Sequence, residues 1–387
     1  MTPPVPPRAN ETALGSPEAP PPEDAERFMA EALLEARRGL GRTHPNPCVG
    51  AVVVKEGRVV GRGHHVQAGA PHAEVVALQE AGALARGGDL YTTLEPCDHW
   101  GRTPPCTLAI LDAGVARVVS ASTDPNPLVN GKGLARLREA GLGVWTGTRQ
   151  AEADSLNRPF FKAMRTGLPL VTLKVAATLD GKLAAASRDS RWVTGEAARA
   201  EVQQLRSQVD AVLVGAGTVR VDDPRLTARV PGGADRNPLR VVLDTEARLP
   251  LGRRIFQQED RERTVVVPAE DRAEEAAARF VSTGARVWGV GRDGTRLDVT
   301  AVLRRLLEEG AMHVLVEGGA ELFASLLLAK AADELVLYLA PKLLGGDGLS
   351  WLGPLGLLHM TDALEVAVED VAQVGGDFRL RARFLWR

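Results

Sequence analysis

The chain has 387 residues, of which 44% are hydrophobic and 25% are charged, and its formal net charge is −2. This length predicts two domains, because one hydrophobic core rarely serves more than about 300 residues. The charge gives no general attraction to nucleic acid or acidic membranes, and no apolar run is long enough to span a bilayer. No signal peptide is recognised, and three cysteines do not suggest a disulfide framework, so we expect a cytoplasmic protein.

The order of elements predicts an α/β protein. Residues 1–23 are rich in proline, with eight among the first 22, and predict a disordered tail. Helices and strands then alternate, which favours an α/β/α domain with a largely parallel sheet. The predicted elements are a helix over 24–40, a hairpin over 49–63, a helix over 72–88, a strand over 89–96, a helix over 107–114 and a strand over 116–122.

A second α/β series follows a helical connector over 150–166, so we place the domains at 24–166 and 167–387. Strands are predicted over 170–178, 182–187, 211–217, 240–244, 264–268, 313–319 and 334–341, and helices over 196–208, over 298–309 and from Ala320. The two halves carry different motifs, and no internal repeat is recognised.

One histidine and two cysteines in the first half predict a catalytic zinc site. His72 and Glu74 form the motif H-x-E, Cys97 follows Pro96, and Cys106 ends the run PCDHWGRTPPC. Three protein ligands leave a fourth position of the metal for water, whereas structural zinc sites use four protein ligands. Glu74 is then placed to move protons, as in zinc deaminases that act on nitrogenous bases.

The alternative interpretation is that these side chains pack in the core, which would be the better one for any of them alone. Their occurrence together, in this order, favours the metal site. Cys48, before an apolar strand, is interpreted as a core residue. Asn46 and His65 have side chains that can hydrogen-bond a flat heterocycle, and Arg102 offers a fork for a phosphate or carbonyl.

The residues of the second half predict less by themselves. The run Gly215-Ala-Gly217 follows a strand but lacks the third glycine of a Rossmann fingerprint. Gly318-Gly319 lies between a strand and a helix, where backbone N–H groups can bind a phosphate. Glycine pairs are also common turn residues, so these patterns indicate only an α/β domain with a candidate phosphate cradle.

The motifs GRTHPNPCVGAVVV, GRGHHVQAGAPHAE and TLEPCDHWGRTPPC together resemble the bifunctional deaminase/reductase family of riboflavin biosynthesis. Eight residues separate Cys97 from Cys106, whereas base and nucleoside deaminases have two between their cysteines. The second half also resembles the family, in LKVAATLDGKLA, SRWVTG, LRSQVDAVLVGAGTVRVDDPRLTAR, LVEGGAELFASLL and LAPKLLGG. The resemblance covers residues 24–387.

The resemblance implies a cytidine-deaminase-like domain followed by a dihydrofolate-reductase-like domain that uses NADPH. The first would hydrolyse the 2-amino group of 2,5-diamino-6-(5-phosphoribosylamino)pyrimidin-4-one. The second would reduce the ribosyl group of the product, giving 5-amino-6-(5-phosphoribitylamino)uracil. We therefore expect Zn²⁺ and NADPH as cofactors, a phosphorylated pyrimidine as substrate, no nucleic-acid or membrane partner, and a homo-oligomer.

The same resemblance implies residue roles. In the deaminase, the implied pyrimidine contacts are Asn46, His65 and Arg102. In the reductase, the implied substrate contacts are Ser190, Arg206, Leu226, Arg229 and Glu317, with the two arginines suited to the phosphate. The implied NADPH contacts are Ala176, Trp192, Thr218, Asp222, Gly319, Ala320, Glu321, Leu322, Phe323, Ala324 and Ser325. Lys174 and Asp222 are candidates for polarising or protonating the sugar.

Two other hypotheses are open at this point. A nucleic-acid or nucleoside deaminase with an accessory binding domain would be expected to carry a basic groove with stacking aromatics, but aromatic residues make up 4% of the chain. A binding protein that had lost catalysis would be expected to lack the glutamate or a cysteine, and all four groups are present.

Overall fold

The computed structural model of the chain describes residues 21–127, 129–232 and 236–386. The chain divides after Arg165 into two compact units, each with its own sheet and core. The α/β fold class is therefore confirmed, whereas most of the predicted tail, residues 1–20, lies outside the described residues. Within those described ranges, no helix has the length and hydrophobicity needed to cross a membrane.

The N-terminal unit contains a five-stranded sheet with strand order β2-β1-β3-β4-β5. Its strands are β1 (Gly50–Lys55), β2 (Arg58–His64), β3 (Asp89–Thr92), β4 (Arg117–Ser120) and β5 (Gly143–Thr146). Its helices are α1 (Ala25–Arg37), α2 (Ala73–Ala81), α3 (Cys106–Ala113), α4 (Lys132–Glu139) and α5 (Gln150–Leu156), and α6 (Arg158–Thr166) reaches the division between the units.

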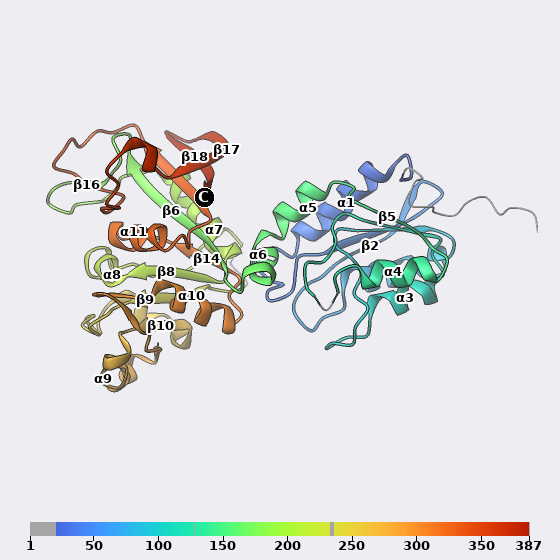
Figure 1. The fold of residues 1–387 in the computed structure, drawn as a ribbon, viewed down its shortest axis with the longest axis horizontal. Helices are drawn as coiled ribbons and strands as arrows, with labels where there is room; N and C mark the ends of the chain where they lie inside the picture. Colours follow the sequence, from blue (N-terminus) through green and yellow to red (C-terminus); the bar gives the residue numbers. More distant parts are fainter. Residues whose placement is uncertain (1–20, 128, 233–235, 387) are drawn as a thin grey trace, which may run out of the picture. The chain divides into compact units, whose positions relative to one another are not determined.

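Helices cover both faces of this sheet, as Figure 1 shows. Val52 and Val54 of β1 pack in one cluster with α1 and α5, while Ala51 and Val53 pack on the opposite face with α2, α3 and α4. This alternation follows from the two-residue period of a strand. The predicted α/β/α layering is confirmed.

Two glycines of β2 allow α2 to approach the sheet closely. A Cβ atom on Gly61 would lie 2.2 Å from the Ala77 carbonyl oxygen, and one on Gly63 would lie 2.2 Å from that of Ala73. Any larger residue would push the helix away. The glycines of the GRGHH motif therefore bring the start of α2 close to the residues that follow β2.

The sheet is less parallel than the sequence predicted. β1 pairs antiparallel with both β2 and β3, and only the β3–β4 and β4–β5 pairings are parallel. The β1–β2 hairpin was predicted. The antiparallel pairing of the short β3 with β1 was not, because no pattern in the sequence indicates it. The prediction also omitted α4 and β5, which are eight and four residues long. Elements this short contain too few residues for their hydrophobic periodicity to be recognised.

The C-terminal unit is built on a nine-stranded sheet with strand order β11-β10-β9-β8-β14-β6-β15-β18-β17. Its strands are β6 (Leu170–Thr178), β8 (Ala211–Gly215), β9 (Leu239–Leu243), β10 (Thr264–Val267), β11 (Arg286–Val287), β14 (His313–Val316), β15 (Glu334–Ala340), β17 (Glu365–Val374) and β18 (Asp377–Leu385). Two small pairs lie outside this sheet: β7 (Lys182–Ala184) with β16 (Leu349–Ser350), and β12 (Arg292–Asp293) with β13 (Arg296–Leu297). The strands from β11 to β15 are parallel, whereas β18 and β17 continue the sheet antiparallel.

Helices cover both faces of this sheet as well (Figure 1). α10 (Val299–Glu308) and α11 (Ala320–Leu328) pack in the largest cluster on one face. α7 (Glu196–Gln208), α8 (Ala216–Asp222) and α9 (Ala273–Phe280) pack on the other. The sequence did not predict α8, α9 or the β17–β18 hairpin. After its first residue, α8 continues with Gly217, Thr218 and Val219, which have low helix propensity, so tertiary packing is what makes this run helical.

The buried carboxylate of Glu95 fixes the end of the strand that leads to Cys97. It accepts hydrogen bonds from the backbone N–H groups of Asp124 (3.2 Å), Gly131 (2.9 Å) and Gly133 (3.1 Å). Gly133 in turn lies so close to this segment that a Cβ there would be 1.9 Å from the Pro96 carbonyl oxygen. Glu95 therefore ties the start of α4 to the residues just before Cys97.

We expect Glu95→Ala to lower the free energy of unfolding by about 3 kcal/mol, because several buried N–H groups lose their acceptor. Urea denaturation measures the change, and hydrogen exchange over residues 129–140 reports its location. Glu139→Ala, at the exposed end of the same helix, is the control and should change stability by less than about 0.5 kcal/mol. An unchanged urea midpoint for Glu95→Ala would contradict this role.

Candidate active sites

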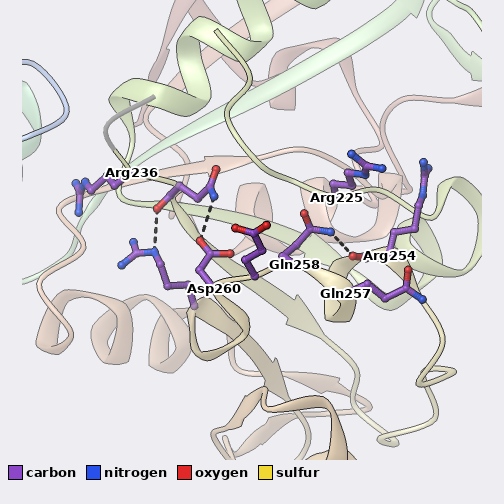
Figure 2. A pocket seen from close by; sticks show the side chains of 9 residues that line it. Arg225, Arg236, Arg254, Gln257, Gln258 and Asp260 are labelled. Atoms are coloured by element: carbon purple, nitrogen blue, oxygen red, sulfur yellow. Dashed lines mark hydrogen bonds between the residues drawn. The ribbon is translucent and has the colours of Figure 1, made fainter. Parts of the chain in front are cut away.

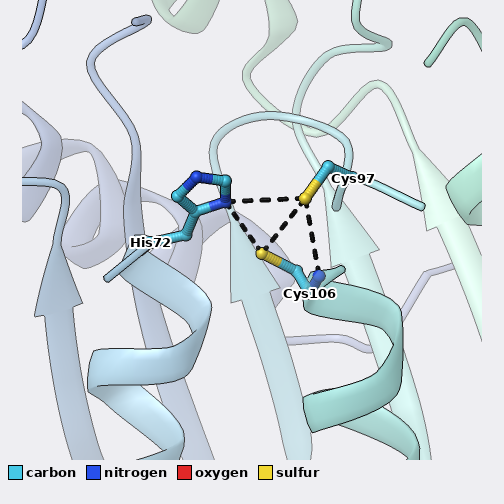
Figure 3. A group of neighbouring side chains, drawn as sticks. All are labelled: His72, Cys97 and Cys106. Carbon is cyan, nitrogen blue, oxygen red and sulfur yellow. Dashed lines mark hydrogen bonds between the residues drawn. The ribbon is translucent and has the colours of Figure 1, made fainter. Parts of the chain in front are cut away.

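Figure 3 shows His72, Cys97 and Cys106 converging from two helix starts and one loop. His72 is the N-cap of α2, Cys106 is the first residue of α3, and Cys97 lies between β3 and α3. His72 Nδ1 lies 3.0 Å from Cys106 Sγ and 3.5 Å from Cys97 Sγ, and the two sulfurs are 3.5 Å apart. The predicted ligands therefore meet in one place.

This donor set fits zinc. Bond lengths of about 2.3 Å to sulfur and 2.0 Å to nitrogen place neighbouring tetrahedral ligand atoms roughly 3.5 Å apart. All three ligand atoms lie within 4.8 Å of one another. One nitrogen and two sulfurs suit zinc better than magnesium or calcium, which prefer oxygen.

The electrostatics of the two cysteines favour a thiolate. The hydrogen bond with Cys106 lowers the pKa of Cys97 to about 4, with His72 and the backbone N–H of Cys106 adding to the effect against burial. That N–H lies 3.4 Å from Cys97 Sγ at the start of α3, where the helix dipole also favours a negative charge. The contact with Cys97, together with burial, raises the pKa of Cys106.

Glu74 lies next to this group and is 3% exposed. Burial raises its pKa to about 7, although the nearby His72 opposes the rise. A carboxyl group that titrates close to neutral pH can both accept and release a proton under physiological conditions. The predicted proton carrier is thus where the sequence motif required it to be.

Asn46 and His65 form a pair beside the metal ligands. Asn46 Nδ2 donates to His65 Nε2 over 3.0 Å, and His65 Nδ1 donates to the Pro71 carbonyl oxygen over 3.2 Å. Burial lowers the pKa of His65, with His72 and His64 adding to the effect. A neutral His65 protonated on Nδ1 satisfies both bonds. Its ring lies edge-on to that of His72, with centroids 5.4 Å apart.

The structure does not bring every predicted deaminase residue into contact with the site. Arg102 is exposed in the loop between the cysteines and makes no hydrogen bond or ion pair with any described residue. Cys48 is 2% exposed, which confirms it as a core residue, and its backbone N–H and carbonyl both bond to the Asn157 side chain.

Three further residues lie near the metal ligands, and two of them, Thr103 and Asp124, were not predicted from the sequence. Thr103 Oγ1 lies 3.3 Å from His72 Nε2. Asp124 is buried, which raises its pKa to about 6, and it interacts electrostatically with Cys97 and His99. The Nδ1 atom of His99 is buried without a hydrogen-bond partner among the described residues. The Asp-Pro-Asn turn after a predicted strand was a signal for Asp124, whereas Thr103 has no signal of its own.

The predicted reductase residues also gather, around the buried carboxylate of Glu317. Glu317 follows β14 and forms an ion pair with Arg206 of α7, in which Arg206 Nη2 donates to Glu317 Oε2 over 2.8 Å. Lys174 on the neighbouring strand β6 has its Nζ 3.8 Å from Glu317 Oε2. Burial would raise the pKa of Glu317, but the surrounding cations hold it below its usual value.

Lys174 and Asp222 belong to the same cluster. Burial lowers the pKa of Lys174, with Arg206 adding to the effect and with Glu317 and Asp222 opposing it. Asp222, the last residue of α8, accepts a hydrogen bond from Ser190 Oγ over 3.1 Å.

The two predicted phosphate-binding arginines differ in how they are paired. Besides its ion pair, Arg206 donates to the Thr227 carbonyl oxygen over 3.2 Å, so its guanidinium is already engaged. Arg229 is exposed and donates to the neutral Thr227 hydroxyl over 2.7 Å. Burial and repulsion from Arg206, Arg225 and Arg254 lower the pKa of Arg229. Arg229 is thus the better candidate to meet a phosphate.

The predicted cofactor residues fall into two groups. Ala176 lies on the same face of β6 as Lys174, two residues away, and Thr218 lies beside Gly318, where a Cβ would be 3.4 Å from its Oγ1. Trp192 is 64% exposed, with Arg199 4.5 Å above its ring. By contrast, Leu322 and Phe323, like the predicted substrate contact Leu226, are buried in core clusters, and Ala324 is fully buried as well.

The start of α11 has the backbone that a phosphate cradle needs. Gly318 and Gly319 have φ angles of +136° and +96°, which favour glycine, and Gly319 is the N-cap of the nine-residue helix. On this helix, Glu321 is exposed and Ser325 is partly buried, and Arg296 donates a hydrogen bond to each side chain. Within the predicted stretch 319–325, backbone groups of the first turn and these polar side chains can therefore face a ligand.

Comparisons with known proteins decide the family. Residues 22–122 match the model of the cytidine and deoxycytidylate deaminase zinc-binding region, and residues 169–379 match the RibD C-terminal domain. The riboflavin biosynthesis protein RibD of Bacillus amyloliquefaciens is 45% identical over 358 residues, covering 92% of this chain and 95% of its own. The chain belongs to the RibD family.

Solved structures of the RibD family agree with this assignment. RibD of Acinetobacter baumannii (form 1) has a TM-score of 0.86 and 38% identity, covering 94% of this chain and 99% of its own. A Thermotoga maritima protein described as a diaminohydroxyphosphoribosylaminopyrimidine deaminase/5-amino-6-(5-phosphoribosylamino)uracil reductase has a TM-score of 0.80 and 37% identity, covering 93% and 99%. The chain is thus a bifunctional enzyme of riboflavin biosynthesis, with zinc and NADPH as cofactors.

Thr103 is expected to orient the metal ligand His72. If Nδ1 binds zinc, Nε2 of the neutral ring carries the proton and donates to Thr103 Oγ1, which fixes the ring. We expect Thr103→Val to weaken zinc binding at least about tenfold, measured by competition with a chromophoric chelator. Thr103→Ser keeps the hydroxyl and should bind zinc like the parent chain. Equal affinities for the parent and both variants would contradict this role.

Proposed function

We propose that residues 24–166 hydrolyse the 2-amino group of 2,5-diamino-6-(5-phosphoribosylamino)pyrimidin-4-one, releasing ammonia. Residues 167–387 then reduce the ribosyl group of the product to give 5-amino-6-(5-phosphoribitylamino)uracil. The observation that carries the proposal is the convergence of His72, Cys97 and Cys106 beside the buried Glu74. The activity for which the Thermotoga maritima relative is named supports the choice of substrate, and the division after Arg165 supports the domain boundary.

In the deaminase, His72, Cys97 and Cys106 hold the zinc. When bound, zinc supplies a nucleophile near neutral pH by lowering the pKa of water. Glu74 takes a proton from the nucleophile and delivers it to the leaving amine, a role that its buried position beside the three ligands supports. The pair formed by Asn46 and His65 presents hydrogen-bonding groups to the pyrimidine ring, and Arg102 extends toward its phosphate.

In the reductase, NADPH supplies the hydride when it is bound. Lys174 and Asp222 polarise or protonate the sugar oxygen. In the cluster around Glu317, these are the two groups that can donate a proton or hold the proton donor in position. Arg206 and Glu317 form the base of the substrate site, while Arg229 binds the phosphate. Ser190 and the backbone at Leu226 complete the substrate contacts.

The NADPH site is proposed along the edge formed by α8 and the start of α11. Thr218 and the N–H groups of the first turn of α11 suit the pyrophosphate, because a helix N-terminus favours negative charge. Ala176, Trp192 and Asp222 border the nicotinamide side. The buried members of the stretch Gly319–Ser325, which are Leu322, Phe323 and Ala324, act by holding this helix in the core.

A deaminase acting on nucleic acid is not favoured, since the matched relatives are riboflavin biosynthesis proteins along most of the chain. We propose that no nucleic acid binds, in line with the net charge of −2 and the scarcity of aromatic residues. None of the three cysteines, all of which lie in the described residues, forms a disulfide, which supports the proposed cytoplasmic location.

We expect Glu74→Gln to lower the rate of ammonia release at least about a thousandfold, because the amide cannot carry the proton. Zinc content, measured by elemental analysis, should stay at the parent level. NADPH oxidation with the deaminated substrate should also persist, which makes this reaction the internal control. Loss of both activities in a folded variant would contradict two independent sites, and an active Glu74→Gln would contradict the proposed role of Glu74.

We also propose that the chain forms a homo-oligomer through the β17–β18 hairpin. β17 is an edge strand, and a bulge between Val368 and Asp370 keeps Val366, Val368 and Val371 on one face. These three valines are 38%, 54% and 63% exposed. An apolar stripe on an open edge favours association with another copy, since it is otherwise an aggregation hazard.

Light scattering of the purified chain at micromolar concentration should therefore give at least twice the mass of one chain. Val368→Glu should shift the mass toward that of one chain, because it places a charge in the contact. Leu34→Glu, at a residue that is 64% exposed in the N-terminal unit, is the matched control and should leave the mass unchanged. A single-chain mass for the parent would refute the proposed oligomer.

A further inference from the structure

A second basic site lies outside the residues assigned to either reaction. It is a cavity of about 580 Å³ in the C-terminal unit, drawn in Figure 2. It is formed by the loop after α8, the residues before β9, and the segment from the 3₁₀-helix Arg254–Gln257 to β10. The lining residues are Arg225, Arg236, Asn237, Arg254, Gln257, Gln258, Glu259, Asp260 and Arg263. A cavity of this size accommodates a small metabolite.

Positive charge dominates this pocket. Four arginines and two carboxylates line it, and three of these charges already have a partner outside the lining. Asp260 is paired with the buried Arg240 over 2.9 Å, Arg236 with Asp210 over 2.6 Å, and Arg254 with Asp223 over 3.3 Å. Arg225 is exposed and makes no hydrogen bond or ion pair with any residue in the described part of the chain. A guanidinium without a partner in a cavity wall is suited to bind an anion.

The arginines stand in two groups. Arg225 and Arg254 lie beside Arg229, whose pKa both of them lower by repulsion, and Figure 2 shows them at one side of the pocket. Arg236 is drawn at the other side, and its charge acts on Arg263, whose pKa is lowered first by burial and then by this repulsion. Because the two groups lie at opposite sides of the pocket, a ligand with two linked anionic groups can contact both of them.

This pocket is separate from the proposed reductase site. Asn237 precedes the amino end of β9, and Asp260 and Arg263 precede that of β10, while Glu317 follows the carboxyl end of β14. None of the residues assigned to the substrate or to NADPH lines the cavity. The two regions share only the loop after α8, which carries Arg225 in one and Arg229 in the other.

We propose that this pocket binds a small molecule with two phosphate groups, at a site distinct from those of the substrate and NADPH. Arg225 and Arg254 hold one phosphate, and Arg236 and Arg263 hold the other. Each contact is a charge-assisted hydrogen bond, and arginine can make it with two parallel N–H groups. The amides of Gln257 and Gln258 line the space between.

Inorganic pyrophosphate is the probe, titrated calorimetrically into the zinc-loaded full-length enzyme at fixed ionic strength. We expect saturable binding of one pyrophosphate per chain and at least about tenfold weaker binding of inorganic phosphate, since it reaches only one group of arginines. Arg225→Gln and Arg263→Gln should each weaken pyrophosphate binding about tenfold. Arg304→Gln, which changes an exposed arginine of α10, is the matched control and should bind like the parent.

Kinetics distinguish this site from the substrate site. Arg225→Gln should leave the KM values for the phosphorylated substrate and NADPH at the parent level, whereas Arg229→Gln should raise the KM for the substrate while retaining pyrophosphate affinity. Arg225 is exposed and unpaired, so its variant should fold with the parent melting temperature. Absence of saturable binding, displacement of pyrophosphate by NADPH, or a raised substrate KM in Arg225→Gln would each overturn the proposal.

Discussion

The close approach of α2 to β2 is the constraint on which the deaminase site depends. The missing side chains of Gly61 and Gly63 let the helix backbone lie against the strand, so that the N-cap residue His72 reaches the end of the sheet where His65 lies. Larger residues would displace the whole helix, because the atoms they would meet belong to its backbone. The metal ligand is thus positioned by packing several residues away from it.

The other two ligands depend on a different kind of support. Cys97 lies in a loop, where the buried Glu95 and the close contact of Gly133 with Pro96 hold the chain. Cys106 begins α3, whose first N–H points at the Cys97 sulfur. The site therefore combines rigid helix starts with a loop fixed by hydrogen bonds, which keeps the three ligand atoms together.

Charge balance organises the C-terminal unit. One buried carboxylate, Glu317, lies among Arg206, Lys174 and Arg229, and it must stay ionised to compensate for them. The pairing leaves Arg229 with only a neutral partner and Arg225 with none among the described residues. Arg225 lines the basic pocket of the C-terminal unit, whereas Arg229 is not among its lining residues.

The sequence by itself predicted the α/β class, and it singled out His72, Cys97 and Cys106, which the fold brings together with the buried Glu74 close by. It could do so because H-x-E, P-C and the distant Cys106 combine residue types that only a few kinds of site require. It also determined the strands that are long or fully apolar, such as β6. It did not determine the antiparallel β1–β3 pairing, α8 or the β17–β18 hairpin, since short elements and mixed propensities leave the choice to tertiary packing. Only the tertiary structure decided that Arg206 is paired with Glu317, that Thr103 contacts His72, and that Leu322, Phe323 and Ala324 face the core. A residue's type states which bonds it can form, whereas its partner depends on which distant segment the fold places beside it.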